Sequence, residues 1–99
     1  MRDTAPSPEQ ARREYWKNRE STISVIKSAL WVLGSSGGIW PRHNARTVLH
    51  RMAPLENLVR LVLANKDKIY ISKQVMENLL EDAAWLEKVR AKAEHFLKR

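Results

Sequence analysis

The sequence predicts an all-α fold, a four-helix arrangement with long first and last helices and two short central ones. Helix-favouring Ala, Leu, Glu, Lys and Arg dominate the chain, all 3 glycines lie between residues 34 and 38, and two of the 4 prolines lie in the first eight residues. Apolar residues recur at intervals of three and four, which aligns them along one side of a helix. We therefore expect a single helical domain over residues 8–99 after a flexible tail over residues 1–7.

The first helix is expected over residues 8–33. Ser7 and Gln10 have the spacing of a capping box, which satisfies free backbone N–H groups at a helix start. Gly34 is expected to end the helix, because glycine readily adopts the left-handed conformation that closes one. The predicted inward stripe consists of Tyr15, the aliphatic stem of Arg19, Ile23, Ile26, Leu30 and Leu33.

Two short helices are expected next, over residues 42–52 and 54–65. We separate them at Pro54, because proline fits the first turn of a helix but clashes with the preceding turn when it lies inside one. The second of the two is the more apolar, so we expect it to be the central, most buried helix.

The last helix is expected over residues 73–98, with Ser72 as its N-cap. The preceding segment, residues 66–71, is interpreted as a packed loop because no second strand is available to pair with it. Apolar residues of the helix follow a heptad-like pattern that only Asp82 interrupts.

Unequal helix lengths predict an interface. At 1.5 Å per residue the outer helices are about 39 Å long and the central ones about 17 Å, so an antiparallel outer pair would project beyond the short pair. Such an extension has little core of its own, so we expect a homo-oligomer or a bound partner there. The expected interface residues are Tyr15, Trp16, Val89, Phe96 and Leu97.

No motif in the chain indicates catalysis. The Gly/Ser stretch after residue 33 lacks the Lys-Ser/Thr pair of a phosphate loop, and His43 and His50 lie about 10.5 Å apart along their helix, too far to share a metal ion. We therefore expect a protein that is not an enzyme, with no cofactor, metal or small-molecule substrate. With no cysteine and no long apolar run, it is expected to be cytoplasmic and not to span a membrane.

Charge is the most informative feature for function. The net charge is +7, and between Ser21 and Leu55 there are four Lys or Arg residues and no Asp or Glu. A second basic segment begins at Lys88, whereas residues 56–87 carry 4 basic and 6 acidic residues. Unpaired cations of this kind suit a polyanion. The candidate anion-binding residues are Arg42, His43, Arg46, His50, Arg51, Lys88, Arg90 and Lys92.

Two functions remain open on this basis. The first is a small non-enzymatic regulatory or binding protein that engages nucleic acid through a basic helix face. The alternative is a protein-interaction module or inhibitor that docks onto an acidic protein surface or a larger nucleoprotein assembly. Trp40, at the start of the basic helix, is interpreted as an anchor in the core in preference to a binding aromatic.

Overall fold

The computed structural model describes residues 6–35 and 40–98. It has three helices: α1 (Pro8–Ser35), α2 (Pro41–Ala64) and α3 (Lys73–Leu97). The all-α prediction is confirmed, and the described residues contain no strand. Residues 1–5 of the expected tail and residues 36–39 of the expected glycine-rich connection lie outside the described part.

The start of α1 has the predicted capping box. The Ser7 backbone N–H donates to Gln10 Oε1 at 3.3 Å, and the Gln10 backbone N–H donates to Ser7 Oγ at 3.2 Å. The helix ends slightly later than predicted, because Gly34 lies inside its last turn and Ser35 is its final residue.

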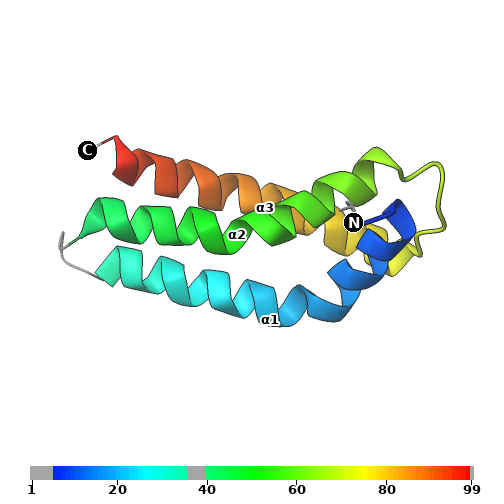
Figure 1. The fold of residues 1–99 in the computed structure, drawn as a ribbon, viewed down its shortest axis with the longest axis horizontal. Helices are drawn as coiled ribbons and strands as arrows, with labels where there is room; N and C mark the ends of the chain where they lie inside the picture. Colours follow the sequence, from blue (N-terminus) through cyan, green and yellow to red (C-terminus); the bar gives the residue numbers. More distant parts are fainter. Residues whose placement is uncertain (1–5, 36–39, 99) are drawn as a thin grey trace, which may run out of the picture.

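The prediction of four helices is wrong, because residues 42–52 and 54–65 belong to one continuous helix, α2, that contains Pro54. A stripe of buried side chains continues across the proline at intervals of four and three: Val48, Met52, Leu55, Val59 and Val62. Burial of each contributes about 1.5–3 kcal/mol, whereas a proline inside a helix costs about 3 kcal/mol. Pro54 is exposed, and Figure 1 shows α2 changing direction near its middle, as expected at a proline.

The connection between α2 and α3 is a packed loop, as predicted. Ile69 and Ile71 pack against the core, whereas Tyr70 between them is 78% exposed. Ser72 then caps α3, because its hydroxyl accepts the backbone N–H of Val75 at 3.3 Å.

The helix α2 lies between α1 and α3 and contacts both (Figure 1). Because α2 runs antiparallel to each neighbour, α1 and α3 run parallel to one another. The projecting extension inferred from the sequence required an antiparallel outer pair, which the structure does not have. The three helices have 28, 24 and 25 residues, so no long pair projects beyond shorter ones.

A buried polar cluster joins α1 to α3. Asp82 is only 3% exposed, and its carboxylate accepts the Tyr15 hydroxyl at 2.6 Å. The Arg19 guanidinium donates to both oxygens of the same carboxylate, through Nε at 2.6 Å and Nη2 at 2.9 Å. Burial, together with the hydrogen bond to Asp82, raises the pKa of Tyr15 well above its usual value. Asp82, which interrupts the apolar pattern of α3, therefore links α3 to α1.

Candidate functional site

The fold gathers the basic segments of the chain at one end of the molecule. Because α2 is antiparallel to α1 and α3, the second half of α1, the first half of α2 and the second half of α3 lie at the same end of the molecule, where α1 ends and α2 begins (Figure 1). We call this part, residues 21–35, 40–55 and 88–98, the basic half. The remaining described residues, 6–20 and 56–87, form the mixed half.

The two halves differ sharply in charge. The basic half carries eight Lys or Arg residues and one carboxylate, that of Glu94. The mixed half also carries eight Lys or Arg residues, but it balances them with nine Asp or Glu residues. Positive potential is therefore concentrated at one end of the protein.

Most cations of the basic half are available to a ligand. Among the described residues, seven of them are exposed and form no ion pair. These seven, which we call the free cations, are Lys27, Arg42, Arg46, Arg51, Lys88, Lys92 and Lys98. Exposed and unpaired cations can contact an anion without first breaking a salt bridge.

Arg90 is the exception among the proposed anion-binding residues. Its Nε donates to Glu56 Oε2 on α2 at 2.9 Å, and its Nη1 lies 3.5 Å from Glu94 Oε2. The hydrogen bond from Arg90 holds the pKa of Glu56 below its usual value. This arginine therefore joins α3 to α2 and already has carboxylate partners.

The cations of α2 do not share one face. Arg42 and Arg46 are separated by one turn and lie on the same side of the helix, but Arg51 is about 140° further round from Arg46. Arg51 instead lines the groove between α1 and α2, together with Val25. The free cations of α2 thus lie on different sides of the helix.

The two histidines proposed for anion contact, His43 and His50, are exposed. Among the described residues there is no group of three His, Cys, Asp or Glu side chains able to hold a metal ion. The described part of the chain also has no helix with the length and apolar character needed to cross a bilayer.

The residues expected at an interface between copies lie mostly inside the protein. Tyr15 is fully buried and Val89 is 3% exposed, so both belong to the core of a single chain. Phe96 and Leu97 are partly buried against that core. Only Trp16, at 45% exposure, presents a large surface.

Two tryptophans of the basic half, Trp31 and Trp40, have exposed side chains. Trp40 is 72% exposed, so its interpretation as a core anchor is wrong. It directly precedes α2 as its N-cap residue and has a left-handed backbone. Trp31 is 73% exposed and was not proposed as a site residue, although it lies outside the apolar stripe of α1. A tryptophan off the buried stripe is the signal that sequence reasoning missed.

Exposed cations and two exposed indole rings offer charge and flat apolar surface to an anion that carries rings. Comparison of the chain with protein-family models, curated proteins and solved structures gives no match.

Proposed function

We propose that the protein is a small non-enzymatic binding protein that engages nucleic acid through its basic half. The observation that carries the proposal is the contrast between eight cations with one carboxylate at this end and eight cations with nine carboxylates elsewhere. Nucleic acids present regularly spaced phosphates, and each phosphate neutralised by Lys or Arg releases condensed counterions. The seven free cations of the basic half are available for contacts with phosphates.

The test is a titration of labelled duplex DNA by fluorescence anisotropy over a series of salt concentrations. Replacing Arg42 and Arg46 with Ala removes two exposed cations from one side of α2. The slope of log affinity against log salt should become shallower by about 2, because each lost phosphate contact removes about 0.9 from it.

The matched control is Lys66→Ala with Lys68→Ala. These two exposed lysines lie in the α2–α3 connection, at the far end of the molecule, and their loss lowers the net charge by the same amount. The control should leave the slope unchanged. Equal effects from both pairs would mean that only net charge matters, and wild-type protein that binds neither DNA nor RNA at low salt would refute the proposal.

A second function, docking onto a larger protein through an apolar contact, is favoured by one observation. Val25 and Val32 are each 43% exposed and line the groove between α1 and α2 that also contains Arg51. An interface of this kind buries apolar area, so its affinity should depend weakly on salt. Recovery of a protein partner from the native host that survives nuclease and high salt would favour this function.

A further inference from the structure

The four tryptophans divide into two groups by their surroundings. Trp85 is partly buried and packs against the core, and the ring of Trp16 lies 6.4 Å from that of buried Tyr15. Trp31 and Trp40, in contrast, are each nearly three-quarters exposed, and neither packs against the core. Packing among the described residues therefore accounts for Trp85 and for part of the Trp16 surface, and it buries little of Trp31 or Trp40.

The backbone of Trp40 adds a cost to its exposure. Its φ of 54° lies in the left-handed region, which is unfavourable for a bulky residue and is tolerated best by Gly, Asn and Asp. Its side chain also makes no capping hydrogen bond to α2. A large side chain held exposed on a strained backbone is typical of a functional position.

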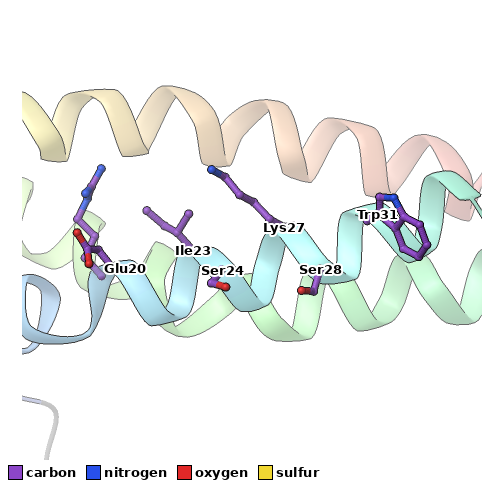
Figure 2. A pocket seen from close by; sticks show the side chains of 7 residues that line it. Glu20, Ile23, Ser24, Lys27, Ser28 and Trp31 are labelled. Carbon is purple, nitrogen blue, oxygen red and sulfur yellow. The ribbon is translucent and has the colours of Figure 1, made fainter.

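Each of the two tryptophans has a cation close to it in sequence. Lys27 lies one helical turn before Trp31, and Arg42 lies two residues after Trp40. In sequence, Glu20 is the nearest carboxylate to Trp31, and at 1.5 Å per residue it lies about 16 Å away along α1. The open pocket that Trp31 lines is long and also includes Lys27, Ser24 and Ser28 near the ring and Ile23, Arg19 and Glu20 farther along α1. Its two cations thus outnumber its one carboxylate, and Figure 2 shows Lys27 extending toward the side on which α3 runs.

We infer that Trp31 and Trp40 are stacking platforms for unpaired bases, so that the preferred ligand is single-stranded nucleic acid. This inference rests on the proposed function and names its ligand. The bases of a duplex already stack on each other, and inserting a side chain between them requires unstacking. Every base of a single strand presents a ring face, and adjacent cations hold its phosphates.

The experiment compares labelled oligothymidylate with a labelled duplex of equal length, both titrated over the same series of salt concentrations. Trp31→Leu and Trp40→Leu keep apolar bulk but remove the ring, and each should weaken single-strand binding by about 5- to 150-fold. Trp31→Phe and Trp40→Phe, which retain a ring, should keep most of the affinity. Because no cation changes, the salt slope should stay at its wild-type value in all four variants.

Tyr70→Leu is the matched control, since this aromatic residue is 78% exposed in the α2–α3 connection at the far end of the molecule. It should bind as wild type does, and circular dichroism should show all variants folded. Leu variants that bind oligothymidylate as tightly as wild type would overturn the inference, while salt-dependent duplex binding would keep the proposed function intact. Tryptophan-dependent binding to phosphatidylserine vesicles without binding to oligothymidylate would overturn it in favour of a membrane surface.

Discussion

The carboxylate of Asp82 provides the sharpest test of how the fold is held together. Its side chain is 5% exposed, and that of its partner Arg19 is 21% exposed. Asp82→Leu would leave the Arg19 guanidinium without its counter-charge and the buried Tyr15 hydroxyl without its acceptor. Removing one partner of a buried ion pair costs about 3–5 kcal/mol. For a domain of this size, that loss should lower the melting temperature by at least about 12 °C.

A second variant separates this cost from any general damage to the core. In the triple variant Tyr15→Phe, Arg19→Met and Asp82→Leu, every member of the cluster becomes apolar, so no buried polar group is left unpaired. Replacing a buried ion pair by apolar residues of similar volume is often neutral or stabilising. The triple variant should therefore unfold with a free energy close to or above that of wild type.

Both variants are measured by urea unfolding followed by far-ultraviolet circular dichroism, with the unfolding free energy extrapolated to water. The reasoning predicts that the single variant is much less stable than the triple variant. Wild-type stability in Asp82→Leu would show that the cluster contributes little. A triple variant as unstable as the single one would show that the packing around residue 82, and not the unpaired groups, sets the cost.

Two further predictions follow from the same structure. The pKa of Tyr15 is higher in the folded protein than in the unfolded chain. The protonated hydroxyl therefore contributes its full stabilisation below about pH 10, the usual tyrosine pKa, and this stabilisation is lost as the pH rises through the pKa of the folded protein. Urea midpoints of wild type should thus fall more steeply at alkaline pH than those of Tyr15→Phe, and parallel curves would contradict this. Pro54→Ala should raise the melting temperature, because it restores a backbone N–H at an exposed position inside α2; a lower melting temperature would indicate that packing needs the proline-induced bend.

Local patterns in the sequence were sufficient for most of the secondary structure. The capping box at Ser7 and the N-cap at Ser72 depend on neighbours within a few residues, so their geometry follows from spacing. Pro54 was misread because its local cost was weighed without the buried stripe on both sides of it. That stripe, with its intervals of four and three, is present in the sequence, and the free energy gained by burying it exceeds the cost of one proline inside the helix.

The candidate site was only partly accessible from sequence. Arg42 and Arg46, both exposed, belong to a segment without carboxylates, and the sequence alone shows that absence. The ion pair between Arg90 and Glu56, 34 residues apart, could not be predicted from the sequence, because it depends on how α3 packs against α2. The partners of Asp82 come from still farther away, 63 and 67 residues along the chain.

The sequence by itself determined where helices form and that charge is separated along the chain, because both depend on residue type and spacing. Only the tertiary structure decided that the basic segments meet. Three helices connected in order make α1 and α3 parallel, so the two basic segments, separated by residues 56–87, arrive at the same end. Four helices in the expected arrangement would have placed them differently, because each reversal of the chain exchanges the ends at which its segments lie.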